Sequence, residues 1–548
     1  MPQGRRKVPF SGKAKKLQLQ IKRQSNAKGG FLLKAAAAED DDHNCHKINI
    51  QPKHNPNRYA LKFYKESETE LKKLKETGRH GLVKRDYKDL ELQDDYFKDL
   101  DFPKRPPWDY TMSVDDVQRN EQHYFTEYVN RLEKQHEGLS YFELNLETWR
   151  QLWRVLEMSD VILIITDIRY PLLMFPPYLY DYITKDLKKH MILVLNKIDL
   201  APAPLVCAWF NYFKDKYPDL HILLFTSYPG YNVVKESTSV KSRKLKGRPQ
   251  MSAEGAESLL KVCKSIVKDC VDLTSWEQKI IQEQSSSNDD DEDLEIEQET
   301  NINNDTSSYE MFKNGVLTIG CVGHPNVGKS SLMNALMGKK VVSVSKTPGH
   351  TKHFQTIFLT NNVKLCDCPG LVFPSAVPKC MQVLMGCYPI SQLRETFSTI
   401  RFVAERLDLP KLLHLIHPDD DEEWSPFNIC EAWAIKRGFL TARAARPDIH
   451  RAGINLLQLC LSGVICLKLT PPGFEDDKER WEHHEDLAEI LRIQAKSKQD
   501  DNKDINFDDL SDDNEDLSKP KNEEHSDSEG SSDSEIPAMQ NKFAALMN

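Results

Sequence analysis

The segment GHPNVGKS, Gly323–Ser330, constrains the fold of this chain more than any other. It follows the apolar run GVLTIGCV and precedes the helix-like run SLMNALMG, so it predicts a strand, a phosphate-binding loop and a helix in that order. Gly323 and Gly328 allow the backbone N–H groups to face phosphate oxygens, next to the positive end of the helix. Lys329 would supply a charge to the β- and γ-phosphates, and Ser330 a hydroxyl ligand to Mg²⁺. The predicted phosphate-binding residues are Gly323, Asn326, Val327, Gly328, Lys329, Ser330 and Ser331.

A second motif, DCPG, ends another apolar run. Asp367 in this motif can hold a Mg²⁺-bound water, and Gly370 can donate its backbone N–H to a γ-phosphate. Between the two motifs, Thr351 is the predicted switch threonine, whose hydroxyl completes the Mg²⁺ shell only when the γ-phosphate is present. Thr347 is the alternative to it, and an ordinary Pro-Gly turn would explain the segment without either role.

The segment VLNKIDLAP has the residue types of a guanine-reading loop. Asp199 can accept from the N1–H and exocyclic amine of guanine, a pair that adenine does not offer, and an unpaired buried acceptor costs about 1–3 kcal/mol. Asn196 would brace the loop, and the stem of Lys197 would lie over the purine ring. The segment FTSYP follows the next apolar run and predicts a second loop beside the base, containing Thr226 and Ser227, with Ser227 near O6.

These motifs stand in an unusual order, because NKID precedes the phosphate loop by more than a hundred residues. If all of them belong to one site, the chain is a rotated version of the ordinary arrangement. A rotated chain needs a linker between its old ends and must begin at the strand that normally follows DxxG. The acidic, polar residues 274–315 fit the linker, and VILIITDIR, Val161–Arg169, fits the strand. We therefore predict a single circularly permuted site.

Short apolar runs alternate with helix-like stretches, which predicts a doubly wound α/β domain with a mostly parallel sheet. This domain is expected over residues 101–379, including the flexible linker 274–315. Residues 380–475 read as a mainly helical domain. One helical stripe ahead of the first strand is predicted to be core, namely Leu146, Trp149, Leu152, Trp153 and Leu156. The ends of the chain, residues 1–100 and 476–548, are expected to be largely disordered.

Charge is distributed unevenly along the chain, although the net charge is only −9. Met1–Lys34 contains ten basic residues and no acidic one, whereas Asp500–Glu535 contains fifteen acidic residues and three lysines. The basic end predicts an address for nuclear import factors and a contact with RNA phosphates, or only a solvated tail. The acidic end is expected to be a solubilising tail.

Twelve cysteines occur without a repeated CxxC pair, so neither a disulfide framework nor a zinc ribbon is indicated. The run His43-Asn44-Cys45-His46 lacks a second ligand pair at metal spacing, and chance composition explains it better. The chain shows no N-terminal apolar region and no apolar run of about eighteen residues, so we expect a soluble intracellular protein without a membrane partner.

The motif order resembles that of the YlqF/YawG family of circularly permuted GTPases, over roughly residues 100–475. The resemblance lies in DFPKRPPW, LETWRQLWRVLEMSD, DIRYP, NKIDLAP, GHPNVGKSSLMN, VVSVSKTPGHTKHFQT, LCDCPGL and CEAWAIKRGF. It implies GTP and GDP binding, slow hydrolysis, and work on ribosomal RNA or pre-ribosomal particles. We accordingly expect a monomer in the nucleus or nucleolus, with shuttling to the cytoplasm.

The resemblance also bears on catalysis. Leu371 is apolar where many regulatory GTPases have a water-orienting Gln. Asn326 resembles the asparagine that holds K⁺ in cation-dependent relatives, so our hypothesis is that K⁺ bridges Asn326 and the phosphates. The expected catalytic residues are Asn326, Lys329, Thr351 and Gly370. The role of Asp167 and Arg169 in DIRYP stays open between a salt-bridged strand end and a function facing the site.

Two other functions fit the same sequence. One is a GTP-regulated adaptor that scarcely hydrolyses GTP and does not bind ribosomal precursors. The other is non-enzymatic, a chaperone-like binding of basic proteins by the acidic tail. If the chain is a switch, DCPG connects directly to the helical residues 371–475, so the nucleotide state is expected to reorient the helical domain.

Overall fold

The computed structural model describes residues 67–109, 111–136, 139–226, 253–285, 310–339, 341–342, 344, 354–441 and 445–494. In this part of the chain six strands form one sheet, in the order β3-β2-β1-β4-β6-β5. The strands are β1 Val161–Asp167, β2 His190–Asn196, β3 His221–Phe225, β4 Leu317–Val322, β5 Gln355–Thr360 and β6 Val363–Asp367. All neighbouring strands are parallel except β5 and β6, which are antiparallel.

The strand order confirms the predicted rotation of the chain. Strands β1 and β4 are far apart in sequence yet pair at the centre of the sheet, with Val161 opposite Ile319. Counting from β4 as the first strand gives the spatial order 6-5-4-1-3-2, in which the phosphate loop follows the first strand, as in an ordinary G domain. The predicted fold class, a circularly permuted α/β domain with a mostly parallel sheet, is therefore confirmed.

The centre of the sheet is buried on both faces, as its continuous apolar sequence predicts. Every residue of β1 is buried. Helix α4, Leu146–Met158, precedes it, and all five residues of the predicted stripe are buried. A Cβ at Gly320 of β4 would lie 2.6 Å from Ser159 Oγ and 2.8 Å from Val155 Cγ1. The glycine thus lets the end of α4 pack directly on β4.

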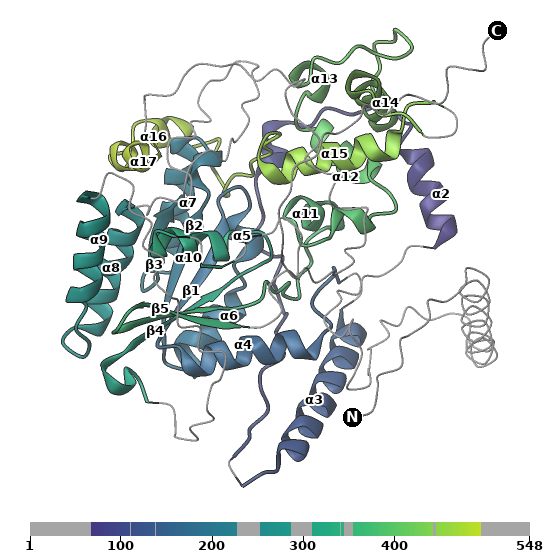
Figure 1. Ribbon diagram of the computed structural model, residues 1–548. Coiled ribbons are helices and arrows are strands. Elements are labelled where there is room, and N and C mark those ends of the chain that lie inside the picture. Colours follow the sequence, from purple (N-terminus) through teal and green to yellow (C-terminus); the bar gives the residue numbers. More distant parts are fainter. Residues whose placement is uncertain are drawn as a thin grey trace, which may run out of the picture. The chain divides into compact units, whose positions relative to one another are not determined.

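Helices accompany the sheet and continue after it (Figure 1). Besides α4, those before β4 are α2 Glu68–Thr77, α3 Val114–Gln135, α5 Pro171–Met174, α6 Pro177–Asp181, α7 Ala203–Lys216, α8 Ala253–Val267 and α9 Thr274–Ser285. Those after it are α10 Lys329–Met337, α11 Lys379–Leu384, α12 Phe397–Ala404, α13 Leu409–Leu412, α14 Pro426–Arg437, α15 Ile449–Ser462, α16 Lys478–Glu482 and α17 Leu487–Gln494. No helix of the described residues is long and apolar enough to cross a membrane.

Residues 380–475 are mainly helical, as predicted, and α12, α14 and α15 lie together in Figure 1. Local signals set the ends of these helices. Ser425 caps α14 by accepting from the Asn428 N–H, Pro426 occupies its first turn, and Gly438 ends it at a φ of +67°. Gly463 ends α15 at a φ of +81°.

The structure differs from the predicted domain limits in three places. Helix α2 lies within the predicted disordered residues 1–100, α9 within the predicted linker 274–315, and α16 and α17 within the predicted tail 476–548. Each contributes buried apolar side chains, which are Leu71, Trp276, Ile280, Trp481 and Ile490. The charge pattern of ESETELKKLKE does indicate α2. The amphipathic helices α9, α16 and α17 are hidden in the average polar composition of ranges much longer than the helices themselves.

Candidate nucleotide site

The predicted phosphate loop connects β4 to α10, and two of its glycines are required by geometry. Gly323 has a φ of +152°, and a Cβ on it would lie 2.5 Å from the carbonyl oxygen of Ile165. Gly328 has a φ of +100°, and a Cβ there would lie 2.4 Å from Asn196 Nδ2. Any other residue would therefore strain the loop and push it away from the neighbouring strand ends.

Lys329, Ser330 and Asp367 form the charged centre of this loop. Lys329 Nζ donates to the carbonyl oxygens of Gly323 and His324 at 3.0 and 2.7 Å. Burial lowers the pKa of Lys329, and the Asp367 carboxylate opposes that shift. Ser330 Oγ donates to Asp367 Oδ2 at 3.1 Å.

Asp367 is fully buried, and burial raises its pKa to about 6 against the opposing effects of Lys329 and Ser330. Its Oδ1 atom has no hydrogen-bond partner among the described residues. An unpaired buried carboxylate oxygen is costly, and a divalent cation would satisfy it. Ser330 and Asp367 therefore fit the Mg²⁺ site predicted from the sequence.

The NKID loop lies against the phosphate loop. Asn196 Nδ2 donates to the carbonyl oxygen of Val327 at 2.7 Å, and Lys197 Nζ donates to that of Asn326 at 2.6 Å. Asn196 Oδ1 also accepts from the backbone N–H of Lys197 at 2.8 Å. Two motifs in the reverse of the usual order thus meet at one edge of the sheet.

Asp199 is buried at the same edge, and its Oδ1 accepts from Thr226 Oγ1 at 2.8 Å. This bond joins the NKID loop to the end of β3, so Thr226 lies where the second base-side loop was predicted. The predicted residues Ser227 and Thr351, and the alternative Thr347, lie outside the described residues. Ser331 follows Ser330 in the first turn of α10.

The DCPG end touches the phosphate loop closely. A Cβ at Gly370 would lie 2.8 Å from the Cα atom of Pro325 and 3.2 Å from Lys329 Nζ. The next residue, Leu371, is fully buried and donates its N–H to the carbonyl oxygen of Gly323 at 3.2 Å. Its side chain is thus part of the core, where it has no group that could orient a water.

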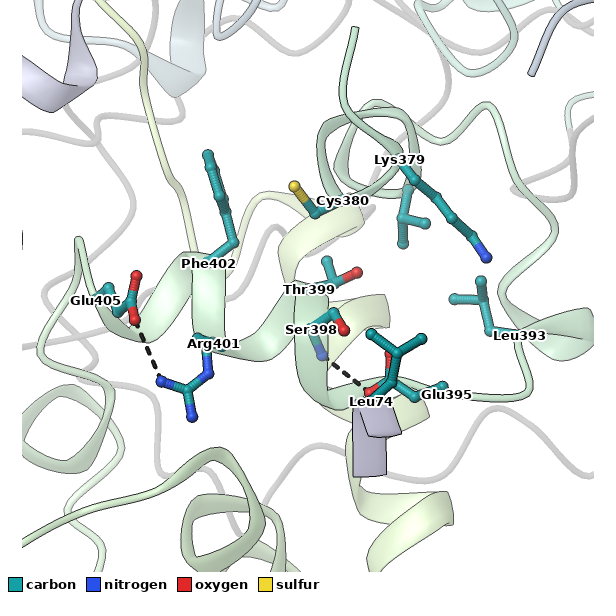
Figure 2. Close-up of a pocket in the computed structure, with 11 residues that line it drawn as sticks. Leu74, Lys379, Cys380, Leu393, Glu395, Ser398, Thr399, Arg401, Phe402 and Glu405 are labelled. Carbon is teal, nitrogen blue, oxygen red and sulfur yellow. Dashed lines mark hydrogen bonds and ion pairs between the residues drawn. The ribbon is translucent and has the colours of Figure 1, made fainter. Parts of the chain in front are cut away.

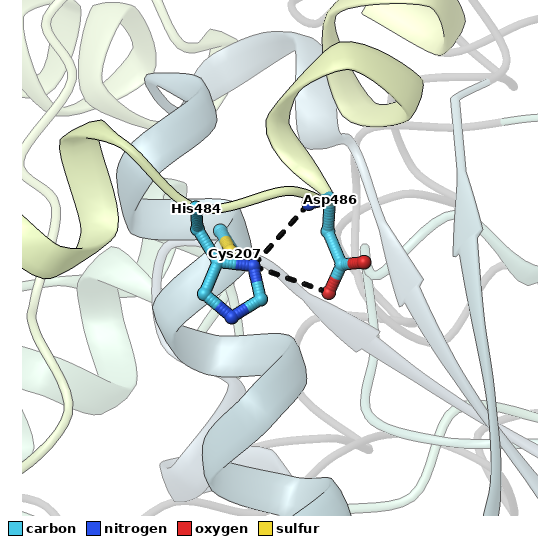
Figure 3. Close-up of side chains that lie close together, drawn as sticks. All are labelled: Cys207, His484 and Asp486. Atoms are coloured by element: carbon cyan, nitrogen blue, oxygen red, sulfur yellow. Dashed lines mark hydrogen bonds and ion pairs between the residues drawn. The ribbon is translucent and has the colours of Figure 1, made fainter.

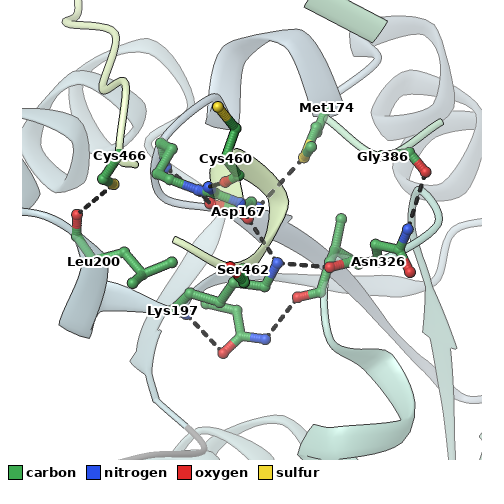
Figure 4. A network of polar contacts seen from close by, with 12 residues as sticks. Asp167, Met174, Lys197, Leu200, Asn326, Gly386, Cys460, Ser462 and Cys466 are labelled. Atoms are coloured by element: carbon green, nitrogen blue, oxygen red, sulfur yellow. Dashed lines mark hydrogen bonds and ion pairs between the residues drawn. The ribbon is translucent and has the colours of Figure 1, made fainter. Parts of the chain in front are cut away.

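Asn326 extends from the phosphate loop toward the helical domain. Its Nδ2 atom donates to the carbonyl oxygen of Gly386 at 3.1 Å, just beyond α11 (Figure 4). The residue also has a φ of +59°, a conformation that asparagine tolerates better than most residues. The sequence did not predict this contact between the two domains.

Asp167 and Arg169 of DIRYP form a salt bridge at the end of β1. Arg169 Nη2 and Lys197 Nζ donate to Asp167 Oδ2 at 2.8 and 2.7 Å, and Arg169 Nη1 donates to the carbonyl oxygen of Cys460 at 2.8 Å. Burial alone would raise the pKa of Asp167, but the two cations hold it well below its usual range. The pair is both a salt-bridged strand end and a support for the NKID lysine.

Residues near the end of the described chain also support the NKID loop. Gln494 Nε2 of α17 donates to the carbonyl oxygens of Ile198 and Ala201 at 2.7 and 2.9 Å, on either side of Leu200. Cys466 Sγ donates to the carbonyl oxygen of Leu200 at 3.3 Å. Sequence motifs could not identify these residues, although the apolar spacing of LAEILRIQ does indicate a helix with a buried side.

A pocket of about 390 Å³ lies elsewhere, between α2, α11 and α12 (Figure 2). Leu74, Val383 and Phe402 are among its lining residues, and Arg401 pairs with Glu405 at its edge at 3.3 Å. None of its lining residues belongs to the nucleotide motifs. The pocket is therefore separate from the nucleotide site.

Comparison with known proteins agrees with this geometry. The family model described as "50S ribosome-binding GTPase" matches residues 318–429. The chain is 43% identical over 543 residues to guanine nucleotide-binding protein-like 1 of Rattus norvegicus, covering 90% of each chain. The chain belongs to the guanine nucleotide-binding protein-like 1 family. Members of this family are circularly permuted GTP-binding proteins, which accounts for the motif order found here.

Two less similar proteins also match this chain. The large subunit GTPase 1 homolog of Mus musculus is 30% identical over 537 residues, covering 86% of this chain and 79% of that relative. A GNP-bound YlqF from T. maritima is 18% identical, with a TM-score of 0.34, and the match covers 59% of this chain and 97% of that one. The fold assignment rests on the strand order of the chain itself.

Proposed function

We propose that this chain is a slow GTPase that depends on Mg²⁺ and K⁺ and acts as a nucleotide-dependent switch on ribosomal precursors. The GTPase part of this proposal rests on the contact between the NKID loop and the phosphate loop. Asn196 donates to the carbonyl oxygen of Val327, and Lys197 donates to that of Asn326. The ribosomal half draws on the relatives, whose descriptions include a 50S ribosome-binding GTPase and a large subunit GTPase.

Each residue of the site has a role in this proposal. Asp199 reads the guanine base, while Lys329 and the Gly370 N–H stabilise charge on the phosphates. Ser330 and Asp367, completed by Thr351 in the GTP state, would hold Mg²⁺. When bound, Mg²⁺ neutralises the negative charge shared by the β- and γ-phosphates.

Hydrolysis needs a group that replaces the missing glutamine, because Leu371 is buried and apolar. In our proposal the side-chain oxygen of Asn326 would hold K⁺, whose charge would stabilise negative charge developing on the phosphates. The Asn326 Nδ2 bond to the Gly386 carbonyl supports this, since it orients the amide and engages its nitrogen. The test is GTP turnover in K⁺ and Na⁺ buffers, for the wild type and Asn326→Asp. Equal turnover in all four measurements would exclude the K⁺ proposal.

The switch rests on two contacts between the nucleotide loops and the helical domain. One is Asn326 to Gly386, and the other runs from Lys197 through Asp167 and Arg169 to the Cys460 carbonyl. We expect GTP to protect the segment around residues 371–379 from protease relative to GDP. Equal cleavage in the two nucleotide states would argue against domain reorientation.

The proposed target is a pre-ribosomal particle in the nucleus or nucleolus, contacted by the basic residues 1–34. Sedimentation of cell extract through a sucrose gradient with GTP or GDP tests this directly. Co-migration with precursor particles that is salt-sensitive and lost on deleting residues 1–34 is the expected result. Migration with other proteins would favour a GTP-regulated adaptor, and loss of binding on deleting only the acidic residues 500–548, beyond α17, would favour acidic-tail binding.

A further inference from the structure

Three side chains of metal-ligating type meet where α16 and α17 pack on α7 (Figure 3). Cys207 comes from α7, whereas His484 and Asp486 come from the turn between α16 and α17. One ligand atom from each residue lies within 4.8 Å of the other two. Spacing along the sequence could not reveal this group, because Cys207 is remote in sequence from the other two residues.

We propose that Cys207, His484 and Asp486 bind one transition-metal ion of the zinc class, with water as a fourth ligand. Sulfur, imidazole nitrogen and carboxylate oxygen are the ligand types of zinc, whereas Mg²⁺ and Ca²⁺ take oxygen ligands. His484 Nδ1 and Asp486 Oδ2 lie 3.4 Å apart. Two ligands placed about 2 Å from a tetrahedral ion are separated by roughly 3.3 Å, so this edge of the site already has suitable dimensions.

Burial gives the site a closed side and an open side. Cys207 is fully buried, while the side chains of His484 and Asp486 are 18% and 36% exposed. Ions and water can therefore approach from the side of the histidine and the carboxylate. Three protein ligands and one open position form a common coordination set for zinc.

Outer contacts orient two of the ligands. Asn211 Nδ2 donates to Cys207 Sγ at 3.5 Å, from the next turn of α7. The Trp481 ring lies 5.8 Å from the His484 ring, at an interplanar angle of 31°. Metal sites depend on such second contacts to hold the ligand atoms in place.

The surroundings of His484 Nδ1 also favour a cation. The backbone N–H and the carboxylate Oδ2 of Asp486 both lie close to this atom, at 3.3 and 3.4 Å. An ion between the nitrogen and the carboxylate would gain two ligand bonds at the cost of the long backbone hydrogen bond.

A metal at this position would fasten α16 and α17 to α7. Gln494, at the end of α17, is the residue that holds the Ile198 and Ala201 carbonyls of the NKID loop. Metal binding is therefore expected to stabilise the guanine-reading loop at a distance from the nucleotide. This consequence rests on GTP binding by the chain, whereas the metal site itself does not.

The test uses the full chain, purified without a histidine tag, loaded with Zn²⁺ and dialysed. Bound zinc is measured by atomic emission. We expect Cys207→Ser and Asp486→Asn each to lose about one zinc per chain relative to the wild type. The controls Cys270→Ser and His483→Ala, which remove an exposed thiol and the neighbouring imidazole, should retain the wild-type zinc content. Zinc bound elsewhere, including at His43–His46, would remain in all variants.

Cobalt supplies a second readout that reports the ligand type. The wild type loaded with Co²⁺ should show a sulfur-to-cobalt charge-transfer band, lost in Cys207→Ser but retained in Cys270→Ser. Equal zinc in the wild type and both site variants, or no such band, would overturn the proposal and leave a His-Asp pair beside a thiol.

Chelation should also speed GDP release severalfold in the wild type and not in Cys207→Ser. An unchanged release rate would overturn the link to the NKID loop.

Discussion

The phosphate loop and the NKID loop meet at one edge of the sheet, but they are held in different ways. Lys329 holds the phosphate loop from within, through the Gly323 and His324 carbonyls. The NKID loop is held by residues outside it. Cys466 and Gln494 donate to backbone carbonyls of this loop. Arg169, which shares the Asp167 carboxylate with the NKID lysine, donates to the Cys460 carbonyl. The phosphate loop thus has a local support in addition to the bonds from Asn196 and Lys197, whereas the NKID loop depends on docked C-terminal segments.

This difference follows from the rotation of the chain. The phosphate loop keeps its strand and helix on either side in sequence, so local geometry forms most of it. The NKID loop belongs to the first half of the domain, and three of its supports come from residues beyond 459. We expect changes in the loop glycines to disrupt phosphate binding, and changes in the C-terminal segments to weaken guanine binding with smaller effect.

The largest effect is expected for Gly328→Ala. The new Cβ would lie 2.4 Å from Asn196 Nδ2, and the φ of +100° adds strain of about 1–2 kcal/mol. Displacing Asn196 from the Val327 carbonyl separates the two loops, so GTP affinity measured by calorimetry should fall more than about 100-fold, or over 2.7 kcal/mol.

Gly473→Ala is the matched control for that variant. Gly473 also has a positive φ, +75°, but a Cβ there would have no neighbour within 4 Å. It should lose about 1 kcal/mol of unfolding free energy and retain GTP affinity. Equal loss of GTP affinity in both variants would show that the clash with Asn196 is not the cause of the loss.

The next effect concerns Glu143. Its backbone N–H donates to the carbonyl of Val372, two residues after the DCPG motif. Burial raises the pKa of Glu143 from 4.5 to about 7, against two opposing backbone hydrogen bonds. Between these values the folded state binds more protons than the unfolded state, so unfolding free energy falls as pH rises from about 4.5 to 7. The total change is about 3 kcal/mol.

Glu143→Gln should remove this pH dependence, because the amide oxygen can still accept the Asn145 N–H but carries no charge. Denaturant unfolding of both proteins between pH 5 and pH 8 measures it, and the variant should be the more stable at pH 8. A constant difference between the two proteins across this range would contradict the raised pKa.

Asp199→Asn tests the base-reading half. Losing the charged acceptor for two guanine donors should weaken GTP binding by about 100-fold and improve binding of xanthosine triphosphate, whose extra carbonyl can accept from the new amide. Competition against a fluorescent guanine nucleotide measures both affinities. Asp215→Asn, on the exposed side of α7, is the control, and equal GTP affinity in the two variants would remove Asp199 from the base site.

Much of this arrangement was predictable because its signals are local in sequence. Apolar runs predicted the buried strands, the GHPNVGKS glycines predicted the loop, and the motif order predicted the rotation. Arg169 could be singled out by resemblance, but its bond to the Cys460 carbonyl could not, since nothing in either segment encodes the other's position.

The unpredicted features depend on tertiary contact or on short helices within polar surroundings. Trp276 and Trp481 mark α9 and α16, yet long acidic stretches follow α9 and the α16–α17 pair and dominate the average composition. The Asn326 contact with Gly386 depends on how two domains pack. Composition averaged over a stretch as short as one helix would indicate α9 and α16. No average along the sequence can indicate the contact between Asn326 and Gly386.

The smallest expected effect, from Gln494→Ala, is the sharpest test of the comparison. The variant removes two hydrogen bonds to buried carbonyls of the NKID loop while leaving every nucleotide motif intact. A typical hydrogen bond contributes about 1 kcal/mol, and water can partly replace the two lost bonds. GTP and GDP should therefore both bind roughly tenfold more weakly. Because the phosphate loop is held locally, binding of inorganic pyrophosphate should not change.

Glu489→Ala, on the exposed side of the same helix, controls for loss of a polar side chain from α17. Nucleotide and pyrophosphate affinities measured by calorimetry then separate base reading from phosphate binding. If Gln494→Ala weakened pyrophosphate as much as GTP, the two loops would form one support system, and the contrast between local and distant support would be wrong.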